Sequence, residues 1–405
     1  MRVLLLNAGS SSLKGSLMES AERTVLAHIR ADWAGPVTRY ERSGPGVAQV
    51  CEQVGFRRPG EAVRHALDDL GVALAPAGER PAAVGHRIVH GGEFRAPVRI
   101  TPAIRSRISA LAELAPLHNP PGLDALAAAE ARLPDVPHVA VFDTAFHATL
   151  PAAARTYPLP HTWTEDWGIR RYGFHGLSHA YCTTRAAELL GRPASELRLV
   201  ICHLGHGCSA TAVLHGHSID TTMGFTPLDG LMMATRSGSV DPGILTHVQR
   251  RYGLGAEQIE DALNQASGLF GVSGISGDMR EVLAAGRAGH ERARLAIAIY
   301  VHRVRQAIGA LTVTLGGIDA LVFTAGVGEN SAEVRMASCQ GLECLGVELD
   351  SDANARCRPD ADVARPAARA RVLVIAARED LAMLSDVVRV VAADKADKAD
   401  KADKE

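Results

Sequence analysis

Four short apolar runs punctuate the chain, and each of them ends in small or polar residues. They are Val3–Leu6, Val139–Phe142, Leu199–Cys202 and Leu321–Phe323. Runs of this length, bounded by turn-forming residues, are typical of buried β-strands. Between them lie Gly122–Arg132 and Glu291–Leu311, which carry apolar residues at helical spacing. Strands that alternate with helices predict an α/β fold.

A strand, a turn of glycine and polar residues and a second strand occur twice along the chain. The first instance surrounds Asn7–Lys14, and the second surrounds His203–Ser209. Repetition of one unit favours two similar halves. The end of the chain, Asp394–Glu405, is an Asp-Lys-Ala repeat of balanced charge. Such low complexity predicts a solvated tail without a function of its own.

Composition narrows the class of protein. The chain has 405 residues, of which 47% are hydrophobic and 22% charged, and this length predicts two or three globular domains. The formal charge of −2 argues against nucleic-acid binding through a basic surface and against charged tails that seek membranes. No run approaches the 18 or more apolar residues of a membrane span, and Met1–Leu6 is too short for a signal-peptide core. Seven scattered cysteines without a CxxC pair predict reduced thiols in a cytoplasmic protein.

Three turns that follow predicted strands are candidates for binding an anion. In Asn7–Lys14, backbone N–H groups and three serine hydroxyls could surround a phosphate, and Lys14, which is the only lysine among residues 1–394, would add a compact charge. The turns His203–Ser209 and Gly326–Asn330 each carry two glycines, which allow a backbone to approach a nucleotide closely. None has Walker A spacing. Ordinary turns would explain each of them alone, but three in one chain favour a nucleotide site.

Several charged residues stand in segments that are otherwise apolar or rich in glycine. Arg87 lies in a strand-like run and needs an anionic partner, which could be an internal carboxylate or a ligand. His175 and Arg236 lie among small residues, and Asp143 follows a predicted strand, where α/β sheets commonly place active-site acids. Two arginines, a histidine and an acid indicate phosphoryl transfer involving a small anion.

The 17 histidines do not predict a structural zinc or iron site. The sequence has no HExxH motif, and the spaced pair His86 and His90 falls in strand-like sequence.

Eight ordered segments resemble the acetate kinase family, which belongs to the superfamily of acetate and sugar kinases, heat-shock chaperones and actin. The similarity runs from residue 1 to about residue 390. The segments are NAGSSSLK (7–14), GHRIVHGGE (85–93), APLHNPP (115–121), VFDTAFH (141–147), RRYGFHGLSH (170–179), SIDTTMGFTPLDGL (218–231), TRSG (235–238) and GVGENS (326–331).

The resemblance implies two similar α/β domains of the actin-like ATPase (ribonuclease H-like) type around a central cleft. The expected first domain comprises residues 1–146 and a returning C-terminal helix, 381–393. The expected second, nucleotide-binding domain comprises residues 147–380, and 394–405 would form the tail. The family is usually a homodimer, and we adopt that assembly by resemblance.

The resemblance also implies an activity, the reversible transfer of the ATP γ-phosphoryl group to acetate, which gives acetyl phosphate and ADP. The cofactor would be Mg²⁺, which Mn²⁺ could replace. Small molecules, and neither nucleic acid nor a membrane, would be the partners. A propionate or broader short-chain carboxylate kinase is the alternative within enzymes, and an ATP-driven chaperone or filament protein that forms no acyl phosphate is the alternative from another class.

Roles carry over residue by residue from the matching segments. Asp143, His175 and Arg236 would be catalytic, with Asp143 positioning groups or Mg²⁺ because a carboxylate substrate needs no strong base. Asn7 and Glu379 would be associated with the metal, Arg87 would bind the substrate carboxylate, and His118 would support the site. The acetate methyl would contact Val89, Leu117, Phe174 and Pro227. ATP would contact Lys14, His203, Leu204, Gly205, His206, Gly207, Asp278, Met279, Arg280, Gly326, Val327, Gly328, Glu329 and Asn330.

The chain departs from the family pattern at a few of these positions. His206 replaces the usual asparagine, which puts a larger and titratable group at the expected phosphate contact. Gly15 replaces an aromatic residue, Ala234 replaces a glycine, and Ala376-Ala377-Arg378 replaces Pro-Thr-Asn before Glu379. The small residues Gly326 and Val327 favour ATP over pyrophosphate as the phosphoryl partner.

Overall fold

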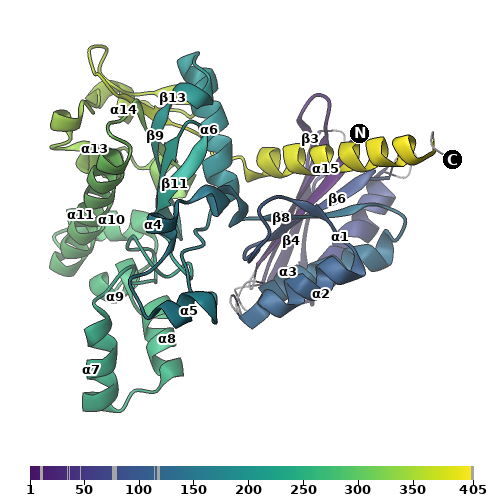
Figure 1. Cartoon of the computed structure of the whole chain (residues 1–405), viewed down its shortest axis with the longest axis horizontal. Helices are drawn as coiled ribbons and strands as arrows, with labels where there is room; N and C mark the ends of the chain where they lie inside the picture. Colours follow the sequence, from purple (N-terminus) through teal and green to yellow (C-terminus); the bar gives the residue numbers. More distant parts are fainter. Residues whose placement is uncertain are drawn as a thin grey trace. The chain divides into compact units, whose positions relative to one another are not determined.

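The computed structural model describes residues 1–9, 12–33, 35, 37–45, 47–74, 80–113, 115 and 119–402. The chain divides into unit 1, Met1–Ala145 with Arg378–Glu405, and unit 2, Phe146–Ala377 (Figure 1). The sequence-based boundaries lie one residue later at the first crossing and three residues later at the second. Within the described part of the chain, no helix has the length and apolar character that a membrane crossing needs.

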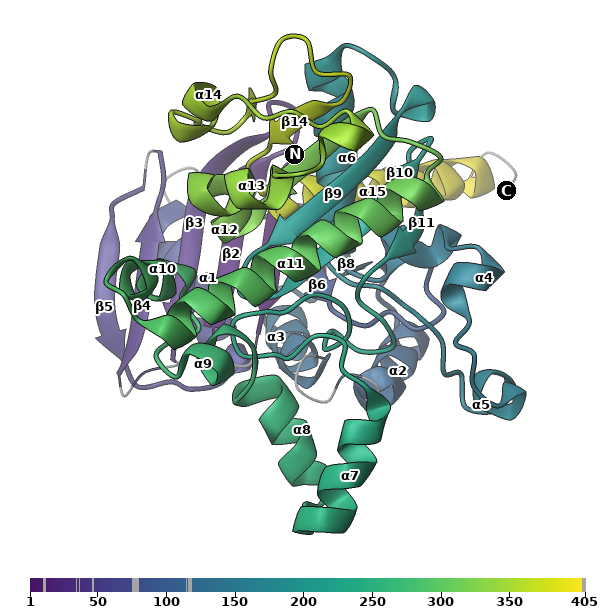
Figure 2. The ribbon, with the colours of Figure 1, turned by 90° about the vertical axis from the view of Figure 1, so that its left-hand side faces the viewer.

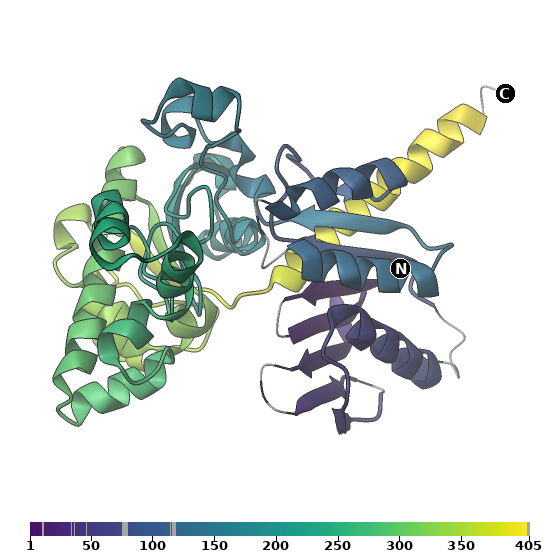
Figure 3. The same ribbon diagram turned by 90° about the horizontal axis from the view of Figure 1, so that it is seen from below.

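Unit 1 is an eight-stranded sheet with helices on both faces. The strand order is β5-β4-β3-β2-β1-β6-β8-β7, with β1, β6 and β8 parallel to one another. Helices α1 and α3 cover one face and the returning α15 covers the other (Figure 3). The strands are β1 (Arg2–Ala8), β2 (Ser12–Glu19), β3 (Thr24–Asp32), β4 (Thr38–Ser43), β5 (Val50–Val54), β6 (Ala83–Ile88), β7 (Val98–Arg99) and β8 (His138–Phe142). The helices are α1 (Pro59–Leu74), α2 (Pro102–Ala110), η2 (Leu111–Glu113), α3 (Asn119–Arg132) and α15 (Glu379–Ala402).

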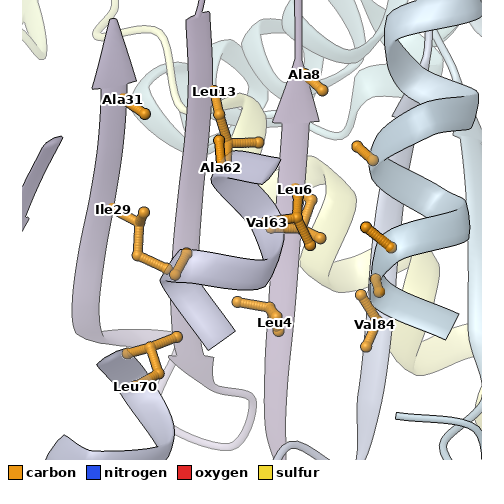
Figure 4. Close-up of a cluster of buried hydrophobic side chains, with 14 of the residues drawn as sticks. Leu4, Leu6, Ala8, Leu13, Ile29, Ala31, Ala62, Val63, Leu70 and Val84 are labelled. Carbon is orange, nitrogen blue, oxygen red and sulfur yellow. The ribbon is translucent and has the colours of Figure 1, made fainter. Parts of the chain in front are cut away.

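Alternation along β1 sorts its side chains between the two faces of this sheet. Leu4 and Leu6 point into the core that α1 and α3 close, as Figure 4 shows. The intervening residues face α15. On β6, a Cβ at Gly85 would lie 2.6 Å from Val387 of α15, so only glycine allows this helix to pack so closely. The sequence predicts that the returning helix ends at residue 393 and that a tail begins at Asp394. In the structure the helix continues into this tail, and α15 ends at Ala402.

Unit 2 repeats the central pattern on a six-stranded sheet of order β11-β10-β9-β12-β14-β13, in which β9, β12 and β14 are parallel. Helix α6 packs on one face and the long α11 on the other (Figure 2). The strands are β9 (Arg198–Leu204), β10 (Cys208–Leu214), β11 (His217–Thr221), β12 (Ala320–Thr324), β13 (Ala361–Asp362) and β14 (Arg371–Val374). Both sheets place antiparallel strands on one side of three parallel ones, four strands (β5 to β2) in unit 1 and two (β11 and β10) in unit 2, so the predicted similarity of the halves is visible in their topology.

The helices of unit 2 surround its sheet and extend to a protruding pair, α7 and α8 (Figure 2). They are α4 (Ala152–Arg155), α5 (His161–Glu165), α6 (Gly176–Leu190), η4 (Ala194–Glu196), α7 (Pro242–Tyr252), α8 (Ala256–Gln265), α9 (Gly268–Ser273), α10 (Met279–Arg287), α11 (Glu291–Thr314), α12 (Ala325–Asn330), α13 (Ala332–Cys339), η5 (Glu343–Leu345) and α14 (Ser351–Ala355), and η3 (Ala145–Thr149) begins at the boundary of the units. All seven cysteines carry free thiols.

One predicted local structure is wrong. The sequence favours a turn over Gly326–Asn330, but the structure forms the short helix α12 there. Ala325 takes a left-handed backbone conformation, with φ at 65°, directly after β12. This residue redirects the chain, so the two glycines continue as helix instead of closing a turn.

Candidate active site

Three of the predicted site residues meet on unit 1 at the carboxyl ends of neighbouring parallel strands. Asn7 lies near the end of β1, Arg87 near the end of β6, and Asp143 directly after β8. The register pairs Leu6 with His86 and Arg87 with Val141. Because side chains alternate between the faces of a sheet, all three site residues project to the face that α15 covers. The first residue of α15, Glu379, completes the group.

Arg87 is the centre of this cluster. Its Nε donates to Asp143 Oδ1 at 3.0 Å, its Nη2 makes a short hydrogen bond to Asp143 Oδ2, and its Nη1 donates to Asn7 Oδ1 at 2.9 Å. Nε also lies 4.0 Å from Glu379 Oε2. Of the two partners that the sequence left open for this arginine, the structure shows the internal carboxylate.

The electrostatics of the pair follow from burial. Asp143 is 1% exposed, and burial raises its pKa above the ordinary value, with the Arg87 charge opposing this shift and the Glu379 charge adding to it. Burial would lower the pKa of Arg87, but the charges of Asp143 and Glu379 raise it above its ordinary value. Each side chain therefore depends on the other to remain charged away from water.

The oxygen atoms beside Arg87 suit a Mg²⁺ ion. Asn7 offers an amide oxygen, and Asp143 and Glu379 offer carboxylates. Mg²⁺ is usually bound through one or two carboxylates together with water and substrate phosphates, and so needs no dedicated protein cage. The described residues hold no group of three His, Cys, Asp or Glu side chains that could hold a metal ion. Asn7, Asp143 and Glu379 would hold the ion, which would neutralise phosphate charge when bound.

Lys14 lies beside this cluster on β2, directly opposite Asn7 in the antiparallel register. Residues opposite each other across two strands project to the same face. The Lys14 side chain is exposed. An ammonium in this position is available to an anion near Asn7.

Of the other residues predicted to contact or support the substrate, Val89, just beyond β6, is half-buried. Leu117 and His118 lie outside the described residues.

In unit 2, His175 stands in an unusual backbone position. It precedes helix α6 with φ at 59°, in the left-handed region that non-glycine residues rarely adopt. Its ring stacks on that of His203, with 4.1 Å between the ring centroids. Its Nδ1 lies 3.0 Å from the Ser209 Oγ. The preceding Phe174 is fully buried, with 1% exposure.

Arg236 and His206 bring two more predicted segments together. The Arg236 Nη1 donates to the Pro227 carbonyl at 3.3 Å, and burial lowers the pKa of this guanidinium. The His206 carbonyl accepts from the Ala234 amide at 3.1 Å. Partial burial of the imidazole ring is the main cause that lowers the pKa of His206, and the Arg236 charge lowers it further. The residue as a whole is nevertheless exposed. Both side chains therefore add positive charge or N–H donors to the same region.

A cavity of about 1240 Å³ opens in unit 2 next to His206. Its walls include the first turns of α10 and α13, whose N-cap side chains, Asp278 and Ser331, accept from the Arg280 and Val334 amides. A Cβ at Gly326 would meet no protein atom within 4 Å, so space for a ligand remains there. The cavity is lined by Gly205, His206, Thr235, Gly277, Asp278, Met279, Arg280, Leu283, Arg287, Gly326, Val327, Asn330, Ser331, Ala332 and Glu333.

Not every residue of the expected ATP contacts lines this cavity. Leu204 is fully buried in β9, and Gly328 is buried against Phe323. The Glu329 carboxylate accepts from the Ala377 amide at 2.9 Å. His203, Gly207 and Glu329 do not line the cavity either, and His203 and Gly207 lie near the His175 ring instead.

Sequence reasoning missed the polar residues that support His175. Ser209 and His179 are both fully buried, and His147 is 2% exposed. The signal that could have revealed them is a set of hydroxyl and imidazole groups at positions where the neighbouring residues are apolar, because buried polar side chains need partners.

The fold is of the actin-like ATPase type, and the molecule is a phosphotransferase with a carboxyl group as acceptor. The chain belongs to the acetokinase family, whose sequence profile matches residues 2–385. It is 48% identical to the acetate kinase of Cyanothece sp. strain PCC 7425 over 399 residues, which cover 95% of this chain and 97% of that protein. The crystal structure of Porphyromonas gingivalis acetate kinase is similar with a TM-score of 0.90 at 39% identity, covering 96% and 99% of the two chains. A propionate kinase from Francisella tularensis has the same TM-score at 36% identity and the same coverage.

Proposed function

We propose that this protein is an acetate kinase, which transfers the γ-phosphoryl group of MgATP reversibly to acetate by direct in-line displacement. Membership of the acetokinase family and the relatives named acetate kinase support this proposal. The products would be acetyl phosphate and ADP. The residues that would take part lie in both units, with the carboxylate-binding group in unit 1 and the nucleotide cavity in unit 2.

The hydrogen bonds of Arg87 carry the proposal. A guanidinium has five N–H groups, and three of them bind Asp143 and Asn7. One N–H on Nη1 and one on Nη2 remain without a partner among the described residues. Two such donors can hold a second carboxylate as a fork. Acetate is a carboxylate and is already a competent nucleophile, so positioning is the main task of this group.

The phosphoryl group requires positive charge and hydrogen-bond donors. Arg236 and His175 would supply them at the transferring group, Lys14 and the backbone around the cavity would bind the nucleotide, and Mg²⁺ would neutralise phosphate charge. Removing one preorganised donor of this kind typically costs a factor of about 10² to 10³ in rate. Asp143 would hold the Arg87 fork in place and contribute to the metal site.

The Asp143→Asn variant tests this role. The amide cannot accept the fork from Arg87 as a charged carboxylate does, so we expect most turnover to be lost. Asp69→Asn is the matched control. Asp69 also forms an ion pair with an arginine of unit 1, with 3.0 Å between its Oδ2 and the Arg42 Nε, but it lies outside the proposed site. Near wild-type turnover in Asp143→Asn would contradict the proposed role.

Acyl phosphate formation tests the function itself. Hydroxylamine traps an acyl phosphate as a hydroxamate, so MgATP and acetate should yield acetohydroxamate in proportion to ADP. The same reaction without acetate controls for ATP hydrolysis. Failure to form a hydroxamate with acetate, propionate and butyrate would overturn the assignment as a carboxylate kinase.

A propionate or broader short-chain carboxylate kinase is the second candidate, because the Francisella tularensis propionate kinase has the same fold similarity as the acetate kinase structure. One methylene in an apolar pocket discriminates substrates by only about 1 to 3 kcal/mol. Comparison of kcat/KM for acetate, propionate and butyrate separates the two candidates. Location in the cytoplasm, a homodimeric assembly and replacement of Mg²⁺ by Mn²⁺ stay predictions.

A further inference from the structure

The His175 ring is connected to a second histidine through a single hydroxyl group. Ser209 Oγ lies 3.0 Å from the His175 Nδ1 and 2.8 Å from the His179 Nε2. Ser209 and His179 are both inaccessible to solvent. The hydroxyl has one proton to donate, so it can donate to only one of these two nitrogens and must accept from the other.

The remaining nitrogen of His179 decides the direction of these hydrogen bonds. Its Nδ1 is buried and has no partner among the described residues. An orphaned N–H in such a place is rarer than an orphaned acceptor, because an unpaired buried donor loses its full hydration. Burial lowers the pKa of His179 well below its ordinary value, so the ring is neutral near pH 7. The single ring proton of His179 therefore belongs on Nε2, which donates to Ser209.

We infer that Ser209 and His179 form a hydroxyl relay that fixes the His175 ring with its proton on Nε2. Since Ser209 accepts from His179, it donates its own proton to the His175 Nδ1. That nitrogen must then be unprotonated and accept through its lone pair. The His175 Nε2 carries the remaining N–H. A Cβ at Gly207 would lie 3.2 Å from this nitrogen, so Nε2 faces the turn between β9 and β10.

The relay leaves an N–H donor on the His175 Nε2, and an anion requires such a donor. An Nε2–H donates to a phosphoryl oxygen, whereas the other tautomer would present a lone pair and repel it. Two other contacts hold the ring and its backbone: His203 stacks on the ring, and the His147 Nε2 lies 3.0 Å from the Phe174 carbonyl. Ser209 and His179 are thus positioning residues, and their importance for turnover rests on the proposed phosphoryl transfer.

Nuclear magnetic resonance tests the tautomer without any turnover. Long-range ¹H–¹⁵N correlation spectra of the full chain, labelled at the histidine ring nitrogens, distinguish Nε2–H from Nδ1–H. The His175 signals are assigned by their loss in His175→Asn. We expect a protonated Nε2 and an unprotonated Nδ1 on His175. A proton on Nδ1 in the resting protein would overturn the inference, whatever reaction the protein catalyses.

Variants of Ser209 test whether the relay matters for turnover. We expect Ser209→Ala to lower kcat about tenfold with less than a twofold change in the KM for ATP, and Ser209→Thr, which keeps the hydroxyl, to restore most of it. Thr211→Val is the matched control, because Thr211 lies two residues along the same face of β10 and its hydroxyl pairs with that of Thr221 at 2.8 Å. It should lower stability without a comparable loss of kcat.

The outcomes separate the relay from the proposed function. Equal kcat in Ser209→Ala and the wild type, or equal losses in Ser209→Ala and Thr211→Val, would refute a positioning role. Absence of any acyl phosphate from the wild type would refute the proposed function and leave the tautomer measurement intact. If Ser209→Ala does not fold, the Ser209→Thr variant and the wild-type spectra still decide.

Discussion

Acid should destabilise unit 2 through His147. This ring is 2% exposed, with its Nδ1 2.8 Å from the Ser218 Oγ and its Nε2 3.0 Å from the Phe174 carbonyl. A carbonyl only accepts, so Nε2 carries the proton and Nδ1 accepts from the serine hydroxyl. Protonating Nδ1 would force the Ser218 hydroxyl to turn and accept, because it could no longer donate to that nitrogen, and would place a charge in the core.

The magnitude follows from the pKa of this ring. Burial is the main cause that lowers the pKa of His147 from 6.5 to about 4. One pKa unit corresponds to about 1.4 kcal/mol, so this difference is worth about 3 kcal/mol of unfolding free energy. Because the unfolded chain binds the proton more readily, the contribution is complete above about pH 6.5 and is lost as the pH falls toward 4.

Urea unfolding at pH 7.5 and at pH 4.5 measures this effect. In His147→Gln the amide can donate to the Phe174 carbonyl and accept from Ser218, but it cannot be protonated. The variant should lose less unfolding free energy between the two pH values than the wild type, by about 2 to 3 kcal/mol. His217→Gln, an exposed histidine on β11, should behave like the wild type. Identical pH dependence of His147→Gln and the wild type would refute the reasoning.

Three further substitutions probe the candidate site. Arg87→Lys should lower kcat/KM for acetate about a hundredfold, because an ammonium cannot replace the planar fork, and steady-state kinetics showing less than a threefold change would contradict this. Gly326→Val should raise the KM for ATP at least tenfold without lowering the melting temperature, since its side chain would occupy open space of the cavity. Gly309→Val on α11, whose side chain would also meet open space, is the control and should leave the KM for ATP unchanged. Lys14→Arg should raise the KM for ATP if a compact ammonium is required, and unchanged KM and kcat would assign Lys14 no such role.

The cluster around Arg87 was predictable from the sequence in its members but not in its geometry. The apolar runs before Asn7 and Asp143 indicate strands, and carboxyl ends of parallel strands share one edge of a sheet. No local pattern shows that Glu379 joins them, because its position depends on a helix that returns to a strand more than two hundred residues earlier. The similarity to the family supplied that residue.

Other features of the site depend on tertiary packing that a sequence does not display. The glycines in Gly326–Asn330 are consistent with a turn, and only the left-handed backbone of Ala325 shows why the segment is a helix. Ser209 and His179 lie in a strand and a helix that also carry Thr211, Ser178 and Thr183, so the pattern alone does not single them out. Their role becomes visible when one hydroxyl is found between two rings.

The return of α15 to unit 1 has a consequence for biosynthesis. A ribosome that has released residues 1–145 has not yet made the helix that covers Leu5 and Gly85, whereas all of unit 2 emerges before residue 378. The later unit in the sequence is therefore the first whose chain is complete, although domains generally fold in the order of synthesis. One face of the unit 1 sheet stays uncovered for that interval, and Glu379 arrives with the helix that covers it. A nascent chain cannot bring together the oxygens that we propose for the metal before residue 379 has been translated.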